Sequence, residues 1–114
     1  MNTSQSIKTR RANSYLVKEI LEASPQKLVL KIYDFAIANC RRKDMAKTNK
    51  AVSELIIALS FETDDVKEIS FQLLRLYQFV QDQTRKGEFD SALKILSGLR
   101  TTWQDVFEKE GVAA

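Results

Sequence analysis

Apolar side chains recur at helical spacing in four successive stretches of this 114-residue chain, which contains only three glycines and one proline. An all-β domain would need a turn about every 8–12 residues, and turns favour glycine and proline. Residues three and four positions apart lie on the same face of an α-helix, so this spacing predicts helices that each bury one face. The chain is therefore predicted to be all-α with a single hydrophobic core.

Short polar stretches set the boundaries of the four predicted helices. Ser24 and Pro25 are typical of an N-cap and a first helical position, and Asp44 can cap the next helix. The third helix is expected to end before Gly87, a natural C′ residue, and Asp90 is the expected N-cap of the fourth. These boundaries define helices of about 15–20 residues with short connections.

The short connections decide the predicted architecture. They favour antiparallel neighbours, so we predict an antiparallel up-and-down four-helix bundle with a short additional N-terminal helix at residues 15–21. Residues 14–110 are expected to form one helical-bundle domain. Residues 1–13 are expected to be a flexible N-terminal arm and residues 111–114 a frayed C-terminus.

The residue types needed for most catalytic sites are missing. The chain has no histidine and a single cysteine, Cys40, which excludes the usual general base, an internal disulfide and a thiolate metal cluster. Three scattered glycines cannot form a phosphate-binding loop. Asp64 and Asp65 are adjacent and point to different helix faces, so we interpret them as capping residues. The protein is predicted not to be an enzyme and to need no cofactor or metal.

Charge and hydropathy restrict the class of partner. The net charge is +3, from 18 basic and 15 acidic side chains, which is small for a nucleic-acid-binding protein. Its short basic clusters, Arg10-Arg11 and residues 41–43, are typical of a solvated terminus and loop; non-specific nucleic-acid binding through them is the alternative interpretation. Neither a secretory signal nor an apolar run of about 18 residues occurs. We expect a cytoplasmic protein without membrane insertion or a nucleic-acid partner.

The third and fourth predicted helices have distinctive apolar faces. The third helix carries the most regular one, which predicts a buried seam of Val66, Ile69, Leu73, Leu76, Tyr77 and Val80. Trp103 is expected to pack in the core from the fourth helix. Gly98 in that helix costs about 1 kcal/mol relative to alanine, which predicts a packing or access requirement there.

The helices carry more apolar residues than one bundle core can bury. The surplus residues lie off the predicted seams: Leu30, Phe35, Ile57, Phe61, Phe71, Leu74 and Phe79. Either the N-terminal stretch around Leu16 and Ile20 covers them, or they leave a groove for a partner. An apolar groove between helices suits an amphipathic segment that folds as it binds.

Several motifs resemble those of a known family. The stretch Tyr15-Leu16-Val17-x-Glu19-Ile20-x-x-Ala23-Ser24-Pro25-x-Lys27-Leu28-Val29-x-x-Ile32-Tyr33-Asp34-x-Ala36-Ile37 is similar to the opening of the bacterial flagellar secretion chaperone family FliS, which binds flagellin. Further matches are Asp44-x-x-x-x-Asn49, Leu73-x-x-Leu76-Tyr77-x-Phe79 and Asp90-x-x-Leu93-x-x-Leu96-x-x-Leu99-Arg100-x-x-Trp103. Together they cover residues 15–107. The family usually has glycine where this chain has Phe35.

The resemblance implies a flagellin-specific export chaperone. Such a protein binds the disordered C-terminal segment of flagellin in the cytoplasm, prevents premature polymerisation and delivers the subunit to the flagellar type III export apparatus. Family members hold the client as separate helical pieces, and their N-terminal segment can cover part of the client groove. The alternative is a helical-bundle adaptor or regulator that binds another flagellar protein. The candidate client-groove residues are Leu16, Ile20, Leu28, Ile32 and Phe35, with Phe71 and Phe79 as outer anchors.

Overall fold

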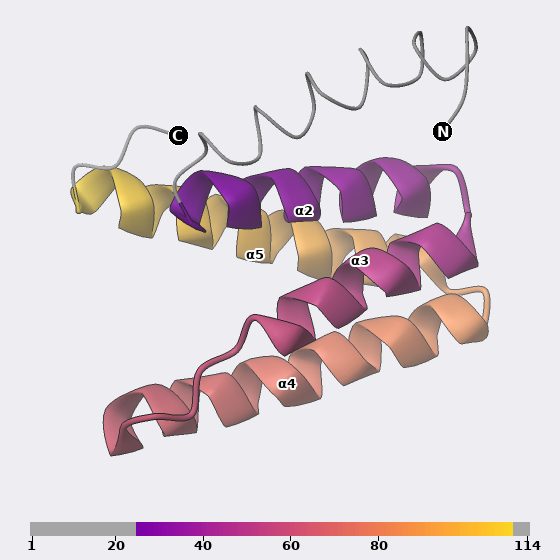
Figure 1. The fold of residues 1–114 in the computed structure, drawn as a ribbon. Coiled ribbons are helices and arrows are strands. Elements are labelled where there is room, and N and C mark those ends of the chain that lie inside the picture. Colours follow the sequence, from indigo (N-terminus) through magenta and orange to yellow (C-terminus); the bar gives the residue numbers. More distant parts are fainter. Residues whose placement is uncertain (1–24, 111–114) are drawn as a thin grey trace, which may run out of the picture.

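The computed structural model describes residues 25–110, and residues 1–24 and 111–114 lie outside the described part. Within residues 25–110 the chain forms four helices and no strand (Figure 1): α2 (Pro25–Arg41), α3 (Met45–Ile57), α4 (Asp64–Arg85) and α5 (Phe89–Lys109). This confirms the all-α prediction for that part. The predicted helix at residues 15–21, the arm at 1–13 and the frayed end at 111–114 lie outside it.

Each of the four helices packs against two others. Helix α2 contacts α3 and α5, and α4 contacts the same two helices, so the four surround a common core. The core side chains include Tyr33, Ala36 and Cys40 from α2, Val52 and Leu55 from α3, Tyr77 and Val80 from α4, and Ala92 and Leu96 from α5. Full burial of such a side chain contributes about 1.5–3 kcal/mol. The packing of these helical faces is therefore the main source of stability.

The end of α2 and the start of α3 share one compact turn. The amide of Lys43 donates to the Cys40 carbonyl at 3.0 Å, and that of Asp44 donates to the Asn39 carbonyl at 2.9 Å. This is the Schellman pattern, which requires a left-handed residue at Lys43, whose φ is 58°. The Asp44 carboxylate then accepts from the Lys47 amide at 3.0 Å, which confirms the predicted N-cap.

A second Schellman turn joins α4 to α5. The Gly87 amide donates to the Thr84 carbonyl at 3.0 Å and the Glu88 amide to the Gln83 carbonyl at 2.8 Å, and Gly87 has a φ of 78°. Gly87 thus ends the helix as predicted. The predicted N-cap at Asp90 is wrong, because this turn brings Glu88 to the cap position and α5 begins directly afterwards at Phe89.

Two expectations about α4 and α5 differ from the structure. The first two residues of the predicted α4 seam are largely exposed, Val66 to 41% and Ile69 to 56%, whereas Tyr77 and Val80 are buried. The reason is that the N-terminal part of α4 diverges from α2 and α5 (Figure 1). At Gly98, a side chain would enter open space, so no contact within the described residues requires glycine there.

The two Schellman turns give a matched test of the left-handed position. Lys43→Gly should raise the free energy of unfolding by about 0.5 kcal/mol, because relief of left-handed strain exceeds the entropy that glycine adds to the unfolded chain. Gly87→Ala should lower it by about 1 kcal/mol for the opposite reason. Urea unfolding followed by circular dichroism measures both. A loss of stability in Lys43→Gly would contradict this account of the turn.

Candidate functional site

An apolar groove opens between α4 and the other helices at the end of the molecule where they diverge. It encloses about 300 Å³. Its lining residues come from all four helices and the connection between α3 and α4: Val29, Leu55, Ala58, Leu59, Ser60, Val66, Ile69, Ser70, Leu73, Tyr77, Trp103 and Phe107. Almost all of these side chains are apolar, which suits an apolar ligand surface.

Unequal helix lengths leave this groove open. Helix α3 has 13 residues and α4 has 22, so about 14 Å of α4 has no turn of α3 beside it. The connection at residues 58–63 partly fills that space, and it is held in place where the Ser70 hydroxyl donates to the Ser60 carbonyl. Val66 and Ile69 lie on the uncovered part of α4.

Aromatic side chains linked by hydrogen bonds form part of the groove lining. The indole Nε1–H of Trp103 donates to the Tyr33 hydroxyl at 3.1 Å, and the hydroxyls of Tyr33 and Tyr77 share a hydrogen bond of 2.5 Å. Trp103 also stacks on Phe107, with ring centroids 5.5 Å apart. The hydrogen bonds connect α5, α2 and α4, so they fix these three helices relative to one another at the base of the groove.

Both phenols of this network stay uncharged at physiological pH. Burial raises the pKa of Tyr33 above its ordinary value of 10.0, and the neighbouring Tyr77 raises it further. Burial likewise raises the pKa of Tyr77. The base of the groove is therefore neutral, which favours an apolar ligand over an ionic one.

An ion pair fixes the α2–α5 wall of the groove. The Arg100 Nε lies 2.8 Å from Asp34 Oδ1, and its Nη2 donates to Asp34 Oδ2 at 3.2 Å. Arg100 also donates to the Gln104 side chain. Two-point contact gives the pair a defined geometry that a single hydrogen bond would not. It therefore positions α5 beside α2 close to Tyr33 and Trp103.

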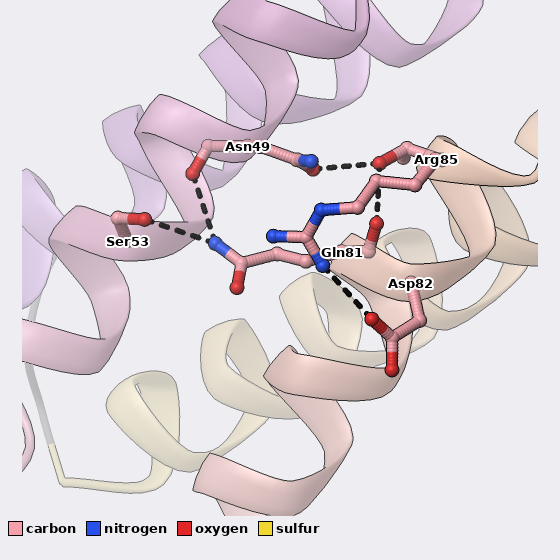
Figure 2. A network of polar contacts seen from close by, with 6 residues as sticks. Asn49, Ser53, Gln81, Asp82 and Arg85 are labelled. Carbon is pink, nitrogen blue, oxygen red and sulfur yellow. Dashed lines mark hydrogen bonds and ion pairs between the residues drawn. The ribbon is translucent and has the colours of Figure 1, made fainter.

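A polar network joins α3 to α4 away from the groove (Figure 2). The Gln81 amide donates to the Ser53 hydroxyl at 2.9 Å and to the Asn49 carbonyl at 3.1 Å. The Thr84 hydroxyl lies 2.7 Å from Asn49 Oδ1, while Asp82 and Arg85 pair on the surface at 2.8 Å. Gln81 and Thr84 are buried. Directional bonds therefore hold α3 and α4 together at this end, whereas the groove end lacks a comparable connection among the described residues.

The structure distributes the predicted client-groove residues over several surfaces. Leu16 and Ile20 lie outside residues 25–110. Leu28 and Ile32 are half-buried on α2, and Phe35, Phe71 and Phe79 are exposed. None of these five lines the groove defined above.

Phe71 belongs to a second, shallower apolar surface. It packs against Phe61, with ring centroids 5.0 Å apart, and lies in a hollow on the outer side of α4 that also includes Leu74. Phe61 is exposed together with Ile57, which at 75% is the most exposed large apolar residue of the described part. Of the predicted surplus, Leu30 is buried instead.

The sequence pattern predicts core positions for three residues that line the groove in the structure. Val66 and Ile69 fit the seam of α4, and Trp103 fits the core face of α5, so periodicity alone predicts burial for all three. The signal that could have identified them is the difference in length between the second and third predicted helices. Helix α3 ends before it can cover the start of α4.

Two further findings concern the described residues only. No three histidine, cysteine or acidic side chains are grouped there in a way that could hold a metal ion. None of the helices α2 to α5 combines the length and the apolar character that a bilayer span requires.

Comparison with known proteins identifies one family. A family model described as flagellar protein FliS matches residues 8–110, which is nearly the whole chain. No curated protein and no solved structure matches.

The buried phenols predict a distinct alkaline sensitivity. Because folding raises both pKa values, their contribution to stability is complete below about pH 10 and is lost as pH rises through the folded pKa values. The free energy of unfolding should therefore fall more steeply above about pH 10 in the native protein than in Tyr33→Phe/Tyr77→Phe. Urea unfolding at several pH values measures both slopes, and the two proteins differ only at these two side chains. Equal slopes would contradict the role assigned to the phenols.

Proposed function

This chain belongs to the FliS family of flagellar proteins, and on that basis we propose that it is a flagellin-specific export chaperone. Family membership implies a role as a flagellar chaperone. In the proposed activity the protein binds the disordered C-terminal segment of flagellin in the cytoplasm. It thereby prevents premature polymerisation and hands the subunit to the flagellar type III export apparatus.

The observation that carries the proposal is the open apolar groove. Val66 and Ile69 face it while remaining largely exposed, so a client that covers them gains apolar burial at both surfaces. Complete burial of one such side chain is worth about 1.5–3 kcal/mol. Several of these contacts together can offset the roughly 2–5 kcal/mol needed to order a flexible segment. Stoichiometric binding of this kind requires no cofactor.

The exposed aromatic residues support a longer contact surface. We infer that the client continues from the groove onto other faces of an antiparallel up-and-down bundle that includes an additional N-terminal helix. Phe35, Phe71 and Phe79 are exposed and available for such contacts. The proposed set beyond the groove is Leu16, Ile20, Leu28, Ile32, Phe35, Phe71 and Phe79.

Two isoleucines of the same chain provide a matched test. Ile69→Gln introduces a polar side chain into the groove and should weaken co-purification with the C-terminal segment of the cognate flagellin by about tenfold, since burying an unsatisfied amide costs at least 1 kcal/mol. Ile57→Gln changes a more exposed isoleucine that does not line the groove, so it should weaken binding much less than Ile69→Gln. Both residues are exposed, so neither change should greatly alter the free energy of unfolding.

Co-expression with different flagellar proteins tests the identity of the client. A one-to-one complex with the flagellin segment at micromolar concentration is expected. Capture of a flagellar regulator in place of flagellin would instead indicate the adaptor function. If Ile57→Gln reduced flagellin binding as strongly as Ile69→Gln, the groove would not be the main contact.

A further inference from the structure

Charge is distributed unevenly along the described part of the bundle. We define the open end as residues 25–29, 58–69 and 103–110, which surround the groove, and the closed end as residues 38–50 and 82–90. The open end has seven acidic and three basic side chains, a net charge of −4, and all seven acidic residues are exposed. The closed end has seven basic and four acidic side chains, a net charge of +3.

Two of these acidic residues adjoin the apolar lining of the groove, whereas Asp64 and Glu68 line the hollow on the outer side of α4. Asp65 directly precedes Val66 at the start of α4, and Glu110 follows Phe107 by three positions at the end of α5. The helix α4 has 22 residues and is about 33 Å long, whereas exposed charges are screened over about 8 Å at physiological ionic strength. A ligand in the groove is therefore influenced by the acidic open end and not by the basic closed end.

We propose that the segment bound in this groove is an amphipathic helix with basic residues beside its apolar face. This inference rests on the proposed function, because it specifies the chemistry of the client at the same site. The apolar face of the helix covers Val66, Ile69 and Trp103, while its basic flanks lie next to the carboxylates of the open end. An equally apolar segment with acidic flanks meets like charge and is disfavoured, so the rim gives selectivity that the apolar lining cannot provide.

Two synthetic helical peptides test the charge preference directly. They share one leucine face and differ only in whether the flanking positions carry lysine or glutamate. Trp103 is the only tryptophan of the chain and lines the groove, so its fluorescence reports binding to the full-length protein. The lysine-flanked peptide should bind about tenfold more tightly, because several exposed ion pairs each contribute a fraction of that factor. The difference should shrink as salt is added.

Two charge-neutralising variants locate the effect. Asp65→Asn/Glu110→Gln should reduce the preference for the lysine-flanked peptide about threefold, since two rim charges are removed. Asp90→Asn/Glu88→Gln is the matched control, because it also removes one first-turn aspartate and one cap glutamate, but at the closed end. This control variant should prefer the lysine-flanked peptide as strongly as the native protein does. Circular dichroism establishes that both variants fold, and the salt titration of the native protein requires no variant.

The remaining outcomes overturn the inference in different ways. Equal affinity for the two peptides, or tighter binding of the glutamate-flanked one, refutes the charge preference, and binding of neither refutes the amphipathic helix as the occupant. A fluorescence change that follows protein concentration alone would identify a second copy of the chain as the occupant.

The flagellin co-purification is independent of these results. A flagellin complex with no peptide preference leaves the proposed function intact, whereas a lysine preference without a flagellin complex supports the groove chemistry and contradicts the client.

Discussion

The unequal lengths of α3 and α4 determine the surface of this protein. A helix of 13 residues cannot cover one of 22, so within residues 25–110 the first turns of α4 extend beyond α3 and keep a partly exposed apolar face. A shorter α4 would have closed the core, and a longer α3 would have buried Val66 and Ile69. The apolar face that packs the centre of α4 into the core continues beyond the end of α3. Val66 and Ile69, on this continuation, line the groove and remain exposed.

The rest of the molecule keeps the groove in place. At the closed end, two Schellman turns and the polar network around Gln81 and Asn49 fix the connections by directional hydrogen bonds. At the base of the groove, the bonds among Tyr33, Tyr77 and Trp103 join three helices. These bonds order the closed end and the base of the groove before a ligand arrives. On binding, conformational entropy is then lost mainly by the ligand and little by the protein, which reduces the total free-energy cost of association.

Capping and turn residues in the sequence predict the boundaries of the helices better than the sequence predicts the location of the groove. Asp44 and Gly87 each mark a boundary because backbone conformation and capping depend on neighbouring residues. The N-cap of α5 lies two residues before the predicted Asp90, because the preceding turn and not the capping preference of Asp90 decides where the helix begins. Exposure at Ile69 depends on where a different helix ends, and periodicity within one helix contains no such information. The apolar surplus was therefore predictable, but its location was not.

Under the proposed function, the chemistry of the groove also bears on release, because a chaperone that hands over its client must release it as well as capture it. A half-exposed apolar lining offers each client side chain only part of the free energy of full burial, so the affinity is spread over many weak contacts. Exposed charges at the rim accelerate encounter more than they strengthen the final complex, because water and salt screen them. Such a groove favours rapid association and does not have to open before the proposed client can leave. A deep, fully enclosed cavity would bind more tightly but would have to open before the client could be transferred.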